Sequence, residues 1–223
     1  MNPKNTFYLR WIGANALGEM LGLGATLGSG FLVIAVLGEA SGLLMSLLSS
    51  VLMVLSGAIE GAIVGWLQWR AMSPWFTQIT RRAWLGATIG GALAAWFFGS
   101  LPFSLMDMNA QATGSQPVKP AQWMVLLAAS GVGLVAGGVL AFFQWRTLRQ
   151  VTRQARWWIP ANSLAWAAGM PLIFWGIDWI QKGMSPLQTG LGLALTLLVT
   201  GAIVSAIHGA FLARWIPANT SEG

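Results

Sequence analysis

The sequence predicts an all-α integral membrane protein, and three observations predict this class: the composition, the length of the apolar stretches and an internal repeat. Of the 223 residues, 56% are hydrophobic and 8% are charged, whereas about 25% of the residues of a soluble domain are charged. Apolar stretches of roughly 20 residues, the length that crosses a bilayer, recur along the chain. They leave no room for a soluble domain, so we expect one membrane domain over residues 1–223.

Six spans account for these stretches. The connection at 107–120 is polar, contains Gly and Pro, and is predicted to form an outer loop. We expect the first span to be retained, because it is too long for a signal peptide and carries a motif that recurs later. The predicted spans are residues 8–37, 43–69, 83–106, 121–147, 158–181 and 187–214.

The basic residues predict the orientation of the chain. Ten of the twelve Lys and Arg residues lie in the N-terminus, in two alternate connections and at the C-terminal end. By the positive-inside rule, we expect both termini in the cytoplasm and the protein in the inner membrane. We interpret the net charge of +6 as attraction to anionic lipid headgroups at the cytoplasmic face, and not as nucleic-acid binding. The ten residues are Lys4, Arg10, Arg70, Arg81, Arg82, Arg146, Arg149, Arg153, Arg156 and Arg214.

A short motif at the start of the odd-numbered spans indicates that the chain is repetitive. W-I-x-A-N occurs at residues 11–15 and 158–162, a variant occurs at 84–88, and the motif starts again at 215–219. Because each unit contains two spans, the copies run in the same direction, related by an axis along the membrane normal.

The even-numbered spans repeat as well, each with three small residues spaced four apart. Such residues let helices approach closely in lipid, so we interpret them as a packing device that gives a dense bundle with little room for a large polar cavity. The two patterns together predict hairpins at 8–72, 83–149 and 158–214 around a pseudo-threefold axis. The small residues are Gly57, Gly61, Gly65, Gly133, Gly137, Ala141, Gly201, Ser205 and Gly209.

The second hairpin carries a resemblance. Gln144-Trp145-x-x-Leu148-Arg149, followed by Arg156-Trp157-Trp158, resembles the repeats of uncharacterised bacterial multi-pass membrane proteins. The resemblance covers most of the chain and implies no activity and no catalytic residue. The first hairpin has Met72 and Ser73 where the second has Leu148 and Arg149, so we do not expect these two positions to be needed in every copy.

Amide side chains are predicted to clamp the helices together. Asn15 and Asn162 lie about one turn inside their spans, as do Gln68 and Gln144. All four therefore share one depth, where amides bond across helices.

Tryptophan is in excess, with 14 copies against one tyrosine. We interpret those near the cytoplasmic ends as an interfacial belt. Trp166, deep in the fifth span, is interpreted as a core-filling indole, with a stacking surface for a ring-shaped cofactor as the alternative. The belt comprises Trp11, Trp66, Trp69, Trp75, Trp84, Trp145, Trp157, Trp158 and Trp215.

Three ionisable residues inside the spans interrupt the repeat. Glu19, Glu60 and His208 have apolar or aromatic residues at the equivalent positions of the other hairpins. We predict that all three share one layer in the cytoplasmic half, because each lies about 9–12 Å from the end of its span. Ionisable groups at that depth are usually functional, and a Glu and His pair suits proton or cation handling. The alternative is a neutral Glu bonded to a nearby Asn, with His208 satisfied by a backbone carbonyl.

We do not expect the protein to be an enzyme. Ser130 and His208 resemble the Ser and His of rhomboid-type intramembrane proteases, but aligned by repeat they lie about 15 Å apart along the helix axis. One His and no Cys do not supply the three or four ligands of a metal site without both glutamates, so no metal is predicted.

Two function classes remain. In the first, a proton, cation or small solute passes or is gated at the Glu19, Glu60 and His208 layer. In the second, the chain is an accessory or assembly subunit of a larger membrane complex, its Gly-rich faces docking partner helices and His208 ligating haem or chlorophyll. A third interpretation is a lipid-facing protein that packs in the membrane and binds no ligand.

Overall fold

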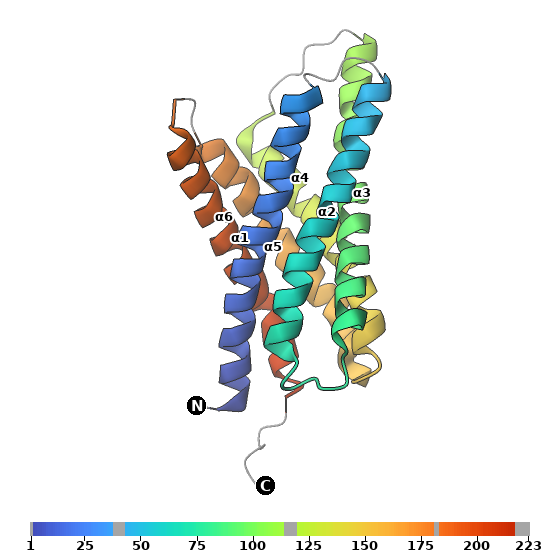
Figure 1. Cartoon of the computed structure of the whole chain (residues 1–223), viewed down its shortest axis with the longest axis vertical. Helices are drawn as coiled ribbons and strands as arrows, with labels where there is room; N and C mark the ends of the chain where they lie inside the picture. Colours follow the sequence, from blue (N-terminus) through green and yellow to red (C-terminus); the bar gives the residue numbers. More distant parts are fainter. Residues whose placement is uncertain (1, 38–42, 114–119, 181–182, 217–223) are drawn as a thin grey trace.

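The computed structural model describes residues 2–37, 43–113, 120–180 and 183–216, and that part of the chain is helical without a strand (Figure 1). The predicted all-α class is therefore confirmed. The helices are α1 (Pro3–Leu37), α2 (Leu43–Met72), α3 (Arg81–Thr113), α4 (Gln122–Leu148), the 3₁₀ helix η1 (Arg153–Trp157), α5 (Trp158–Trp179) and α6 (Pro186–Ala213).

Three of these helices are long and apolar enough to cross a membrane. The qualifying segments are Leu47–Met72 of α2, Gln122–Leu148 of α4 and Pro186–Ala213 of α6. Large apolar side chains such as Leu127 and Leu195 are exposed on their outer surfaces, while polar side chains are buried inside the molecule. An apolar exterior of this extent suits a lipid environment.

The six long helices form a closed ring. Each helix packs mainly against its neighbours in sequence, and α1 packs against α6, which joins the two ends of the chain. The start of α1 and the end of α6 lie at the same end of the ring (Figure 1). At the opposite end, α5 and α6 lean away from α2 and α3.

Backbones approach closely at three of the ring contacts. A β-carbon at Gly61 of α2 would lie 2.7 Å from the Ile89 Cα of α3, and one at Gly137 of α4 would lie 2.7 Å from the Asn162 carbonyl oxygen of α5. At Gly201 of α6, it would lie 2.8 Å from the Asn15 carbonyl oxygen of α1. Only glycine fits at such positions, so the even-numbered helices pack with their backbones against the next odd-numbered helix.

The helix ends follow from local chemistry, with one difference from prediction. At the start of α6, Ser185 Oγ accepts from the Gln188 backbone N–H at 3.3 Å while Gln188 Oε1 accepts from the Ser185 N–H at 2.9 Å, which is a capping box. α3, however, continues to Thr113, so residues 107–113 of the expected outer loop are helical. The rest of that loop, apart from Pro120, lies outside the described residues.

Candidate functional site

One end of the ring is closed by a hydrogen-bonded cluster. We call it the closed end and define it by Trp11, Gln68, Trp84, Gln144, Trp158 and His208, together with Asn15, Thr88 and Asn162. It lies near the start of α1 and the end of α6. All nine side chains are buried, and each of the six long helices supplies at least one of them.

Three tryptophans of the closed end, on α1, α3 and α5, each donate an indole N–H to the even-numbered helix that precedes them around the ring, which for α1 is α6. Trp84 Nε1 donates to Gln68 Oε1 at 3.2 Å and Trp158 Nε1 to Gln144 Oε1 at 3.0 Å. Trp11 Nε1 donates to His208 Nδ1 at 3.1 Å. The three indoles are fully buried, so these three residues do not belong to the interfacial belt in which the sequence placed them.

The residue four positions after each tryptophan donates back to its carbonyl. Asn15 Nδ2 reaches the Trp11 carbonyl at 2.8 Å, Thr88 Oγ1 the Trp84 carbonyl at 3.0 Å and Asn162 Nδ2 the Trp158 carbonyl at 3.3 Å. The oxygens of the first two then accept from the neighbouring even-numbered helices. Gln68 Nε2 donates to Asn15 Oδ1 at 2.7 Å, and Gln144 Nε2 donates to Thr88 Oγ1 at 3.1 Å.

One bond of the cluster crosses the interior of the ring. Gln144 Nε2 of α4 also donates to Gln68 Oε1 of α2 at 3.1 Å, although α3 lies between these two helices and packs against both. The two glutamines therefore join α2 and α4 across the interior of this end. Sequence reasoning brought Asn15, Gln68, Gln144 and Asn162 to one depth but missed Thr88 and the three indoles. Asn162, expected to bond across helices, instead donates to the Trp158 carbonyl of its own helix. The signal for them was the motif itself, in which a Trp is followed four residues later by Asn or Thr.

His208 lies at the closed end and apart from the glutamates. Along α6, Gly201 contacts Glu19 while Gly209 contacts Trp11, and eight helical residues span about 12 Å. The expected layer of Glu19, Glu60 and His208 is thus divided, because His208 sits at the level of Trp11. It supplies the third indole acceptor, one turn before Leu212, the residue that aligns with Gln68 and Gln144.

The surroundings of His208 do not fit a haem or chlorophyll. Its ring centroid is 5.7 Å from that of Trp11 and 5.1 Å from that of Trp158, and the residue is only 2% exposed. Its Nδ1 accepts from Trp11, and His208 does not line the central cavity. A macrocycle would need the space that the two indoles fill. Among the described residues, no group of three or more His, Cys, Asp or Glu could hold a metal ion.

Beyond the closed end, the ring encloses a cavity of about 480 Å³. Helices α1 to α5 line it, mainly with Leu, Ile, Val, Met, Ala and aromatic side chains. Its deep end is marked by Glu60, Leu140 and Trp166, and its far end by Ser49 and Ile177. The expectation of a dense bundle therefore does not hold in this half, although the cavity is apolar.

Two carboxyl groups come together at the deep end of this cavity. Glu60 lines it, and its Oε2 accepts from Trp96 Nε1 at 2.8 Å. Glu19 is 4% exposed, and within the described part of the chain its Oε2 has no hydrogen-bond partner. It interacts electrostatically with Glu60. The two helices touch here, since a β-carbon at Gly22, one turn from Glu19, would lie 3.2 Å from the Glu60 Cα.

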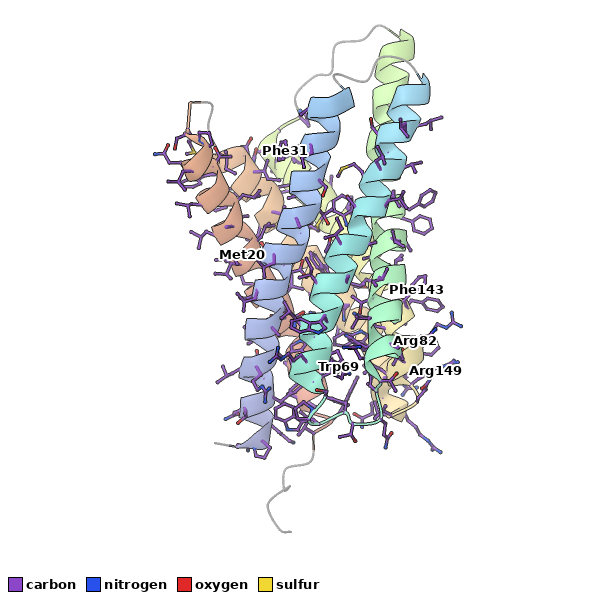
Figure 2. All side chains as sticks on the ribbon, viewed as in Figure 1. Met20, Phe31, Trp69, Arg82, Phe143 and Arg149 are labelled. Atoms are coloured by element: carbon purple, nitrogen blue, oxygen red, sulfur yellow. The ribbon has the colours of Figure 1, made fainter. Side chains whose placement is uncertain are left out.

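Arginine side chains surround the closed end. Figure 2 shows Arg82 and Arg149 on the outside near this end. Arg149 lies over the Trp145 ring at 5.0 Å and Arg70 over the Trp66 ring at 5.3 Å, arrangements that stabilise a guanidinium through the ring quadrupole.

Comparison of the chain with protein-family models, with curated proteins and with solved structures finds no match.

Proposed function

We propose that the chain is a six-span integral membrane protein of the inner membrane, with three hairpins arranged around a pseudo-threefold axis. The contacts support this arrangement, because the Trp-to-acceptor bond and the close glycine approach each recur between α2 and α3, α4 and α5, and α6 and α1. The closed end and both termini face the cytoplasm, since the arginines gather there.

The ring moves a proton or a cation past Glu19 and Glu60. The observation that carries this function is the carboxyl pair at the deep end of the cavity, one member lining it and the other buried with an unpartnered oxygen. Buried ionisable groups in membrane helices commonly mark ion pathways. Neighbouring carboxylates repel each other, and a proton or cation bound beside them removes the repulsion.

The closed end serves as the gate of this pathway. A cation leaving Glu60 toward the cytoplasm meets the Gln68 to Gln144 bond and the three buried indoles. Passage requires that these bonds open, so the cluster holds the resting protein shut. His208 belongs to the gate as the acceptor of Trp11 and does not carry the ion.

Flux in proteoliposomes tests the function. We expect Glu60→Gln to lower the electrically driven flux of protons, alkali cations or lipophilic cations by about tenfold or more, because the amide does not hold a cation or exchange a proton. Glu19→Gln should lower it as well. Asp178→Asn is the matched control, since Asp178 is exposed near the end of α5 and does not line the cavity.

Flux that survives in Glu60→Gln at the wild-type rate would contradict the transport function. That result would favour the accessory-subunit alternative, in which the ring is a scaffold for partner helices.

A further inference from the structure

The chemistry of the cavity is unusual for an inorganic ion site. Apart from Glu60, the side chains with polar atoms that line it are Ser49 and Ser50 at the far end and the indoles of Trp96 and Trp166, and the Trp96 N–H is bonded to Glu60. Na⁺, K⁺ and Ca²⁺ need several oxygen ligands to replace their water. One carboxylate in an apolar lining does not provide them, so a dehydrated inorganic ion is poorly matched to this space.

The size and shape of the cavity match an organic ligand. Its volume of about 480 Å³ lies within the range of roughly 300–1,000 Å³ that small-molecule sites occupy. Glu60 and Ser49, at opposite ends of the lining, are eleven residues apart on α2, or about 16 Å along a helix. The space is therefore elongated, with its one negative group at the deep end.

The lining near Glu60 favours a positive, hydrophobic group. The Trp96 hydrogen bond fixes the direction of the carboxylate, and the rings of Trp96 and Trp166 lie in the same lining. Aromatic faces attract cations, and more strongly when water is excluded. Met53 and Met170 also line the cavity, and methionine adapts its shape to varied apolar ligands.

We propose that this cavity binds a hydrophobic organic monocation, with the positive group at Glu60 and the apolar body against the α3 and α5 side chains. The inference rests on the proposed function and names its substrate class. A single positive charge fits because Glu60 lines the cavity whereas Glu19, its buried neighbour, does not. Burial of the apolar body and the ion pair with Glu60 then both contribute to the binding free energy.

Two probes of the same shape and opposite charge test the proposal. Tetraphenylphosphonium and tetraphenylborate are titrated into the full-length protein in lipid nanodiscs, and binding is followed by isothermal titration calorimetry with empty nanodiscs as the blank. We expect saturable binding of the phosphonium, weakened about tenfold or more by Glu60→Gln, a loss of at least about 1.4 kcal/mol. Asp178→Asn should bind like the wild type, and the borate should not saturate.

A second pair of variants tests the place of binding. Ala136 lines the cavity on α4, while Leu134 is 45% exposed on the same helix. We expect Ala136→Trp to abolish phosphonium binding because the indole fills the cavity, and Leu134→Trp to leave it unchanged. Equal binding of both probes, or phosphonium binding unchanged by Glu60→Gln and Ala136→Trp, would overturn the proposal.

Binding and flux fail independently. Glu60-dependent proton or alkali-cation flux without saturable phosphonium binding would remove the substrate class and leave the transport function. Glu60-dependent binding without flux of any cation would remove transport and leave the cavity as a cation-binding site.

Discussion

The closed end and the cavity half of the same ring use opposite chemistry. At the closed end, nine buried side chains form a cluster whose hydrogen bonds, together with the ring contact between Trp158 and His208, link every long helix to its neighbours. In the cavity half, the lining is mainly apolar and the Glu60 carboxylate accepts a hydrogen bond from Trp96. Polar groups thus hold the helices together at one end, while the other end leaves space.

This contrast indicates which part of the ring determines stability and which part determines function. In lipid, apolar side chains gain little from contact with one another, so close packing and hydrogen bonds hold helices together. The closed end supplies both, and the cavity half supplies a space with one charged group. We expect substitutions in the closed end, or at glycines where two helix backbones touch, to act mainly on folding, and substitutions of side chains that line the cavity to act mainly on ligand binding and flux.

The largest effect is expected at Gly133. A β-carbon there would collide with the Trp166 carbonyl group of α5, whereas one at Gly131, two residues earlier, would meet nothing within 4 Å. Gly133→Val should lower the free energy of unfolding by about 3 kcal/mol, because the α4 and α5 backbones must separate. Gly131→Val should be near neutral. Reversible unfolding in mixed micelles measures both, and equal effects would refute the close approach.

A smaller effect is expected at Gln144. Its amide takes part in three side-chain bonds, to Gln68, Thr88 and Trp158, each worth about 0.6 kcal/mol in membrane helices. Gln144→Leu should therefore cost about 2 kcal/mol. Gln150→Leu is the control, since Gln150 is exposed just after α4. If the two variants unfold alike, the cluster does not hold this end together.

The smallest effect on the free energy of unfolding is expected at His208. This residue could serve as a hydrogen-bond acceptor or as part of the ion pathway, and its variants distinguish the two roles. If His208 takes the place of the glutamine in the other two hairpins, it needs only to accept the hydrogen bond from Trp11 Nε1. His208→Gln should cost less than about 0.5 kcal/mol and His208→Leu about 1 kcal/mol. Flux measured on the same variants should be retained in His208→Gln. A loss of flux in His208→Gln, with stability intact, would instead assign the imidazole to the ion pathway.

Much of the architecture could be predicted from the repeat. The W-I-x-A-N strings and the small-residue spacing set helix positions and brought the amides to one depth, because residue spacing along a helix fixes height. Spacing does not fix which side chains meet. His208 lies one turn before Leu212, the residue that aligns with the two glutamines. The alignment therefore predicts that the third hairpin lacks the acceptor, whereas in the structure His208 accepts the hydrogen bond from Trp11.

The cavity could not be predicted for a related reason. Its space lies between side chains of α1 to α5 and depends on how these helices are tilted, and sequence spacing contains no information on helix tilt. Glu60 was singled out by its charge, but Trp96, its hydrogen-bond partner, was not. The two lie on successive helices, 36 residues apart, and no local pattern connects them.

Thiol accessibility tests the contrast between the two ends most directly. The chain contains no cysteine, so the labelling of a single introduced cysteine can be measured without background from other thiols. Ala95 lines the cavity and Ala141 is fully buried at the level of the closed end. Vesicles of both orientations are treated with a small, charged methanethiosulfonate. We expect Ala95→Cys to react from the face opposite the termini and Ala141→Cys to react from neither face. Labelling of Ala141→Cys from the side of the termini, or equal behaviour of the two, would contradict a ring closed at one end and open at the other.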